Sequence, residues 1–156
     1  MNIIITSGTG KGLTPLAAFD AALFDAGISE YNLIKLSSII PPRSSVEHSK
    51  FYHPENFAGG ERLYVVIAHQ IAQIPGTEAW AGLGWVQEKH NGRGLFVEQS
   101  GSNKAVVEEE IAQTLTSMMK IRRRDYGNHQ KEIKGIICNN EIVCAVVAAI
   151  YKSENW

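Results

Sequence analysis

Apolar residues along this chain occur in two patterns, compact runs and longer stretches with helical spacing. The runs are rich in Val, Ile, Tyr, Trp and Phe, which favour β-strands. The last two predicted strands should form a hairpin that turns at 139–141. The final one is apolar on both faces, which is typical of a central strand. The predicted strands are 2–6, 32–36, 62–72, 79–88, 94–99, 133–139 and 142–152.

Two segments carry the three- and four-residue apolar spacing of amphipathic helices. Thr14 followed by Pro15 is a good N-cap, and Gly27 a good stop, so a helix is predicted over 15–26. Its predicted buried residues are Leu16, Phe19, Leu23 and Ala26. A longer helix should begin after Ser102 or Asn103 and run to about residue 125. Its predicted buried stripe is Val107, Ile111, Leu115 and Met118.

Two glycine-containing stretches are predicted to be irregular. The segment 7–13 should be a loop whose glycines serve a tight turn before the first helix. Its spacing does not fit a phosphate-binding loop, because Gly-Leu rather than Ser or Thr follows Lys11. The segment 43–61, rich in Pro, Gly, Ser and His, is the one long predicted loop. Such loops often belong to a functional site or contact a neighbouring subunit.

The order of elements predicts a single α+β domain, and the composition narrows its functional class. The chain has 156 residues, 44% of them hydrophobic, and 15 basic against 16 acidic residues. This balance gives no electrostatic basis for binding nucleic acid or a membrane surface. No apolar run is long enough to span a bilayer. Two cysteines, the absence of a signal-peptide pattern and scattered histidines favour a cytoplasmic protein without a metal site.

Two adjacent serines, Ser37 and Ser38, follow the second predicted strand and precede Ile-Ile-Pro-Pro. A serine hydroxyl lies within reach of the carbonyl group that precedes it. Attack by Ser38 on the Ser37 carbonyl would convert the amide into an ester, and elimination would then break the chain. An ordinary amide resists this attack, so the step requires strain or a polarised carbonyl. Without further context, a serine pair is usually no more than a turn or a strand end.

The sequence around the serines supplies that context. Segment 32–42 consists of an Asn, four residues, Ser-Ser, two aliphatic residues and Pro-Pro. This pattern resembles the processing site of the pyruvoyl-dependent arginine decarboxylases. Three further blocks are similar to that family in order and spacing, so the resemblance covers nearly the whole chain. They are 14–28, 94–101 and 144–151.

The resemblance implies self-cleavage into a β chain, 1–37, and an α chain, 38–156. Ser38 would become a covalent pyruvoyl group at the start of the α chain. That group would form a Schiff base with the substrate amine and accept electrons as CO₂ leaves. The implied reaction converts L-arginine to agmatine and CO₂.

The family motif also implies roles for single residues. Glu98 matches the proton donor that acts after decarboxylation. Asn32 matches an asparagine that assists self-processing, for which the extended chain between it and Ser37 would have to bend. Asp20 matches the carboxylate that binds the guanidinium group. Leu23 and Ile39 match positions that line the substrate pocket.

The resemblance further implies a four-layer α/β/β/α sandwich of the pyruvoyl-dependent histidine/arginine decarboxylase type. It implies a homotrimer or dimer of trimers, with the small-molecule substrate bound between subunits. Two alternatives stay open from the residues. The substrate could be another amino acid, namely aspartate, ornithine, lysine or histidine. The chain could instead be an unprocessed, non-catalytic binding or assembly protein of the same fold.

Overall fold

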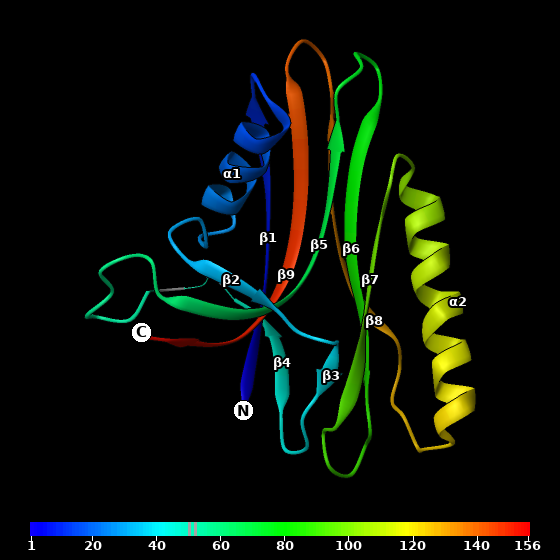
Figure 1. Ribbon diagram of the computed structural model, residues 1–156. Coiled ribbons are helices and arrows are strands. Elements are labelled where there is room, and N and C mark those ends of the chain that lie inside the picture. The colour runs from blue at the N-terminus through cyan, green and yellow to red at the C-terminus, as the bar shows by residue number, and fades with distance from the viewer. Residues whose placement is uncertain (50, 52) are drawn as a thin grey trace.

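The computed structural model describes residues 1–49, 51 and 53–156. This part of the chain forms two β-sheets and two helices, an α+β sandwich in which the sheets pack face to face (Figure 1). The first sheet has the order β2-β5-β9-β1-β4. Its strands are β2 Asn32–Lys35, β5 Arg62–Ala72, β9 Ile142–Glu154, β1 Asn2–Gly12 and β4 Ser45–His48. The second sheet has the order β3-β7-β6-β8, with β3 Ile39–Ile40, β7 Gly94–Gly101, β6 Glu78–Gln87 and β8 Gln130–Ile137.

Three groups of buried apolar residues hold these elements together. One lies between the two sheets and contains Trp85 and Phe96 from the second sheet. Another lies between helix α1 (Pro15–Asp25) and the outer face of the first sheet. The third lies between the second sheet and helix α2 (Lys104–Arg122). The two helices therefore cover opposite outer faces of the sandwich, as Figure 1 shows.

Strand β9 is central, as predicted. It pairs antiparallel with β1 on one side and with β5 on the other. All residues from Val143 to Ile150 are buried. Alternate side chains enter the layer between the sheets and the layer under α1, which explains why this strand is apolar on both faces.

The prediction of a loop at 7–13 is wrong, because β1 continues to Gly12. Three glycines at alternate positions of this strand lie beneath α1 and leave room for its backbone. A Cβ atom on Gly10 would lie 2.3 Å from the Ala22 nitrogen. The close approach also changes the buried face of α1, which consists of Ala18, Ala22 and Leu23. Leu16, predicted to be buried, is 75% exposed.

The predicted C-terminal hairpin is also wrong. Strand β8 pairs with β6 in the second sheet, whereas β9 lies in the first. The connection at 138–141 therefore crosses between the sheets. Cys138 is held there by backbone hydrogen bonds with Gly76 and Thr77, in the loop that joins β5 to β6. Both crossings lie at the same end of the sandwich and hold the two sheets together.

The other predicted elements are confirmed with small shifts. Thr14 caps α1 by accepting a hydrogen bond from the Ala17 N–H, and Asn103 caps α2 in the same way. Helix α2 ends at Arg122, because Arg123 adopts a left-handed conformation. The predicted loop 43–61 contains an unforeseen strand, β4, which pairs parallel with β1. Residues 50 and 52 of this loop lie outside the described residues.

Candidate active site

The two serines lie where the chain passes from one sheet to the other. Strand β2 belongs to the first sheet and ends at Lys35. The next residue, Leu36, still donates its N–H to the Val65 carbonyl of β5 at 2.8 Å. Strand β3 begins at Ile39, which pairs with Leu95 in the second sheet. The bond between Ser37 and Ser38 therefore belongs to neither sheet ladder. Cleaving it would leave the hydrogen bonds of both sheets in place.

The backbone of Ser38 adopts an unfavourable conformation. Its φ angle is +59°, in the left-handed region that residues with a side chain seldom adopt. The Ser38 carbonyl accepts a hydrogen bond from the Phe96 N–H at 2.9 Å. The conformation is therefore held by the hydrogen bond from β7 and by the flanking strands β2 and β3, which belong to different sheets.

Glu98 is the hydrogen-bond partner of the Ser38 side chain. The Ser38 hydroxyl donates a hydrogen bond of 2.7 Å to Glu98 Oε2. Phe96 and Glu98 are two residues apart on β7, so both side chains point to the same face of the strand. Phe96 is buried in the layer between the sheets, and Glu98 lies at its partly buried edge. The Glu98 carboxyl group can therefore exchange a proton with a group at position 38.

Tyr151 fixes the backbone on the other side of Ser38. Its hydroxyl donates a 2.9 Å hydrogen bond to the Ile39 carbonyl, and its ring packs edge-on against Phe96. The pairing of β9 with β5 skips one residue at Tyr151, and such a β-bulge redirects a side chain. Burial, then the negative charge of Glu98, raises the pKa of Tyr151 above its ordinary value. The hydroxyl group therefore remains a hydrogen-bond donor.

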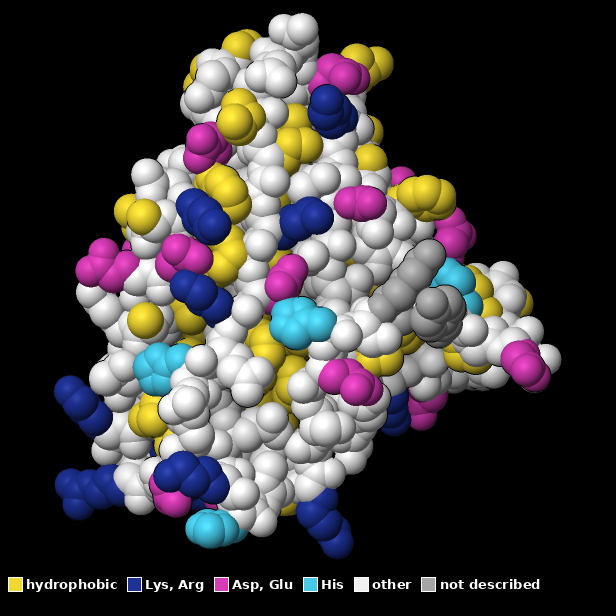
Figure 2. All heavy atoms as spheres, turned by 180° about the vertical axis from the view of Figure 1, so that it is seen from behind, with side chains coloured by type: hydrophobic (Ala, Val, Ile, Leu, Met, Phe, Trp, Pro, Cys, Tyr) yellow, Lys and Arg dark blue, Asp and Glu magenta, His cyan; other side chains and the backbone are white. Residues whose placement is uncertain are grey.

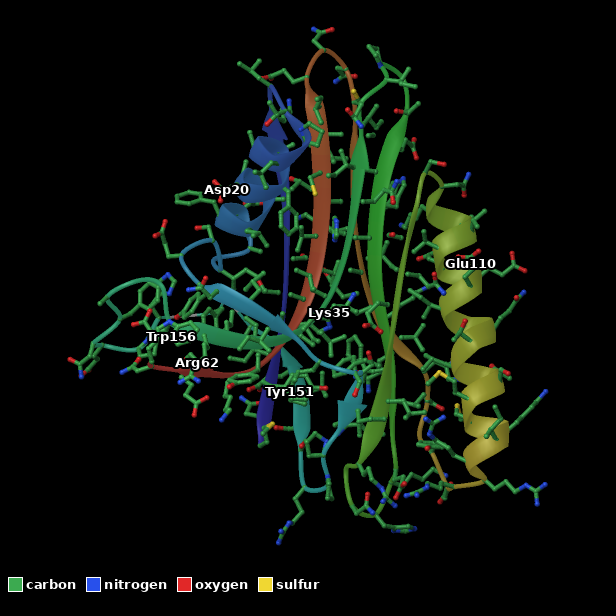
Figure 3. The ribbon with its side chains drawn as sticks, in the orientation of Figure 1. Asp20, Lys35, Arg62, Glu110, Tyr151 and Trp156 are labelled. Carbon is green, nitrogen blue, oxygen red and sulfur yellow. The ribbon has the colours of Figure 1, made fainter. Side chains whose placement is uncertain are left out.

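An open pocket of about 270 Å³ adjoins Glu98. It lies between β5, the end of β2 and the second half of β7. Its lining residues are Lys35, Ile67, Ala68, His69, Glu98, Gln99 and Ser100. Burial, then the positive charge of Lys35, lowers the pKa of His69. Figure 3 shows Lys35 and Tyr151 in the central region of the molecule, where the chain changes sheets.

Sequence reasoning missed Tyr151, Lys35 and His69 as parts of this site. The signal for Tyr151 was a single aromatic residue directly after a fully apolar strand. Lys35 and His69 had no local signal, because only the parallel pairing of β2 with β5 places them on one pocket.

Three predicted site residues lie elsewhere in the single chain. Asp20 is exposed on the outer side of α1, away from Lys35 and Tyr151 (Figure 3). Leu23 is buried between α1 and the first sheet. The Asn32 side chain donates to the Gly60 carbonyl at 2.5 Å, and extended strand separates it from Ser37. The chain by itself therefore brings together Ser37, Ser38, Ile39 and Glu98.

Basic and acidic side chains are interspersed on the face drawn in Figure 2. Among the described residues, no group of three His, Cys, Asp or Glu side chains could hold a metal ion. In the same part of the chain, no helix is long and apolar enough to cross a membrane.

Comparison with known proteins connects this geometry to a family. The model of the family described as pyruvoyl-dependent arginine decarboxylase matches residues 2–155. A pyruvoyl-dependent arginine decarboxylase of Pyrococcus abyssi is 35% identical over 153 residues, covering 94% of this chain and 91% of the relative. One from Halobacterium salinarum is 33% identical, covering 96% and 92%. One from Methanopyrus kandleri is 28% identical, covering 88% and 83%.

Proposed function

The chain belongs to the pyruvoyl-dependent arginine decarboxylase family, and we propose on this basis that it converts L-arginine to agmatine and CO₂. The observation that carries this proposal is the 2.7 Å hydrogen bond between Ser38 and Glu98. It joins the serine that would become the cofactor to the carboxyl group that would act as proton donor. The two residues are 60 positions apart in the sequence and are brought together by the fold.

The surroundings of residue 38 fit a pyruvoyl group formed there. The left-handed backbone at Ser38 places local strain next to the bond that would break, which supports cleavage at this position. Attack on the Ser37 carbonyl gives an ester, and elimination releases a chain that ends at Ser37. Hydrolysis of the resulting dehydroalanine consumes water, releases ammonia and leaves a ketone. The products are a β chain, 1–37, and an α chain, 38–156.

Residues of this chain then position and protonate the substrate. When present, the pyruvoyl group accepts the electrons that are released at the α-carbon as CO₂ leaves. Glu98 holds the proton that the α-carbon receives afterwards. The Phe96 N–H and the Tyr151 hydroxyl fix the backbone carbonyls of residues 38 and 39, so the reacting atoms keep their place beside Glu98.

The guanidinium group of the substrate would be bound by a neighbouring subunit. Asp20 offers the carboxylate for a bidentate contact, yet it lies on the outer side of α1. Leu13, Leu16 and Phe24 are exposed apolar residues of the same region, with exposed fractions of 74–88%. Such a surface supports contact with another copy of the chain. We therefore propose a homotrimer, or a dimer of trimers, in which α1 of one copy completes the pocket beside Ser38 and Glu98 of the next.

The three buried groups support the finer architecture as well. They lie between α1 and the first sheet, between the two sheets, and between the second sheet and α2, which supports a four-layer α/β/β/α sandwich of the histidine/arginine decarboxylase type. Cys138 and Cys144 are free and buried, which supports a location in the reducing cytoplasm.

Release of ¹⁴CO₂ from carboxyl-labelled amino acids tests the proposed reaction. The purified protein should decarboxylate arginine in preference to ornithine, lysine, histidine and aspartate. The Ser38→Ala variant should be inactive toward all five, because it cannot form the ketone. Decarboxylation of aspartate but not arginine would assign a different substrate. Activity in the Ser38→Ala variant would show that the reaction does not depend on a cofactor derived from Ser38.

A further inference from the structure

Glu61, directly before β5, is a buried carboxylate whose hydrogen bonding is incomplete. The side chain is only 9% exposed. Its Oε1 atom accepts a 3.0 Å hydrogen bond from the Ala58 N–H. Its Oε2 atom is buried and has no hydrogen-bond partner among the described residues. Burying a carboxylate oxygen without a partner is costly, so the arrangement suggests a donor other than the described residues, such as a bound ligand.

A pocket of about 210 Å³ lies beside this carboxylate. Two aromatic rings, Tyr31 and Phe57, lie 4.5 Å apart, measured between ring centroids, and help to line it. Burial, then the negative charge of Glu61, raises the pKa of Tyr31 to about 12. The full lining is Tyr31, Pro54, Glu55, Asn56, Phe57, Glu61, Ser153 and Asn155.

The charge of the pocket is one-sided. Among the described residues, its lining includes two carboxylates, Glu55 and Glu61, and neither Lys nor Arg. Arg62, next to Glu61 in sequence, is not one of the lining residues, although its Nε is buried without a partner among the described residues and it contacts the lining residue Asn155. Its guanidinium donates to the Asn155 carbonyl, lies 4.8 Å from the centroid of the Trp156 ring and faces Glu154. Figure 3 shows Arg62 and Trp156 side by side near the C-terminus.

We propose that this pocket binds the guanidinium or ammonium group of a small aliphatic cation, with agmatine as the preferred ligand. A cation of this kind supplies the donors that Glu61 Oε2 lacks and stacks against the faces of Tyr31 and Phe57. The two carboxylates disfavour a ligand that itself carries a carboxylate. Agmatine is therefore preferred over arginine. The choice of agmatine rests on the proposed function.

The pocket is separate from the site at Ser38 within one chain. Tyr31 and Glu61 lie at the beginnings of β2 and β5, which run parallel. Ser38 follows the other end of β2. The pocket would therefore hold the product at a second position, in addition to the place where it is formed.

Equilibrium dialysis with radiolabelled agmatine tests this inference on the purified, full-length protein. The wild-type protein should bind two agmatine molecules per chain. Glu61→Gln keeps an acceptor for the Ala58 N–H but removes the charge, and should weaken one of the two sites by roughly tenfold or more. Glu110→Gln, on the exposed face of α2, is the matched control and should leave both sites unchanged.

A second variant and a competitor make the result decisive. Phe57→Leu keeps an apolar side chain but removes the ring, and should weaken the same site several-fold even if Glu61→Gln does not fold. In Ser38→Ala, which cannot consume arginine, agmatine should displace labelled agmatine from this site at a lower concentration than arginine does. Unchanged agmatine binding in both Glu61→Gln and Phe57→Leu would overturn the inference. Equal competition by arginine would overturn the preference for agmatine.

Asp20→Asn separates this inference from the proposed function. It should weaken the other agmatine site and leave the Glu61 site intact. A protein with a single agmatine site that is lost in Glu61→Gln but kept in Asp20→Asn would support the Glu61 pocket and contradict the role of Asp20. A single site lost only in Asp20→Asn would contradict the Glu61 pocket.

Discussion

Residue 38 and its neighbour in sequence have three hydrogen-bonded contacts, and each restrains a different atom. Glu98 binds the Ser38 hydroxyl, the Phe96 N–H binds the Ser38 carbonyl, and Tyr151 binds the carbonyl of Ile39. The first contact involves a group that can transfer a proton, whereas the other two fix the backbone. Changes at Glu98 should therefore affect chemistry, and changes at Tyr151 should affect positioning.

Glu98→Gln tests the proton donor. Glutamine can still accept the hydrogen bond from Ser38, but it has no acidic proton to give. We expect kcat for arginine to fall by roughly 10²- to 10⁴-fold in protein that has been processed. Rates should be measured per cleaved chain, with cleavage followed on denaturing gels and Glu110→Gln as the control. Full activity per cleaved chain in Glu98→Gln would remove Glu98 from the mechanism.

Tyr151→Phe tests the positioning contact. The ring remains against Phe96, while the hydrogen bond to the Ile39 carbonyl is lost. Stability should fall by about 1 kcal/mol, the usual net value of one such bond. The kcat should decrease with little change in KM, because the reacting group is less well placed. Tyr64→Phe removes a hydroxyl that binds Glu154 at the surface and should leave kcat unchanged. Equal kcat in the two variants would contradict a positioning role.

The serine pair drew attention through its own chemistry and Glu98 only through the resemblance to the family, and the structure brings Ser38 and Glu98 into contact. Tyr151 could not be placed, because its direction depends on a bulge that arises from pairing with β5. The surroundings of Asn32 were equally hidden, since its hydrogen bond to Gly60 joins segments 28 residues apart. Residue types indicate chemistry, whereas contacts between distant segments require the fold.

At the scale of secondary-structure elements, glycines set how closely helix α1 approaches strand β1. Gly8, Gly10 and Gly12 lie on the face of β1 that α1 covers, and the alanines of α1 pack directly onto them. Local pattern alone predicted a loop there, because a glycine-rich segment resembles a turn. The predicted hairpin of 133–139 with 142–152 was wrong for a related reason. Neighbours in sequence usually pair, but these two strands bury their apolar faces in different sheets.

Gly10→Ala tests the close packing of α1 on β1. A methyl group there would meet the backbone of α1 within 2.4 Å, so the helix would have to shift. We expect a loss of roughly 1–3 kcal/mol in the free energy of unfolding, measured by denaturant titration. Lys11→Ala changes the adjacent, exposed position and should have an effect within about 0.5 kcal/mol. Similar effects of the two substitutions would show that α1 does not require this glycine.

At the scale of the whole molecule, one chain provides only half of the proposed site. Ser38 and Glu98 lie where the chain changes sheets, whereas Asp20 lies on the exposed side of α1. The complete site would form only where two neighbouring copies meet. Cleavage should not separate the two resulting chains, because β1 from the first remains paired with β4 and β9 from the second.

Mixed oligomers test whether sites form between copies. Glu98→Gln and Asp20→Asn should each be nearly inactive alone. Co-expression should restore about a quarter of the wild-type activity per site, because random mixing places both intact halves at about a quarter of the interfaces. The measurement is arginine decarboxylation by the purified mixture, with each variant alone as control. No recovery in oligomers shown to contain both variants would contradict a site shared between subunits.

Intact mass spectrometry of the purified protein under denaturing conditions tests the central claim, that Ser38 becomes the cofactor. We predict two chains, one of 37 residues ending at Ser37 and one of 119 residues (156 − 37) that begins at position 38. The larger chain should carry an N-terminal carbonyl that gains two hydrogen atoms on reduction with borohydride. A single full-length mass that persists after prolonged incubation would contradict self-processing and favour an unprocessed, non-catalytic protein.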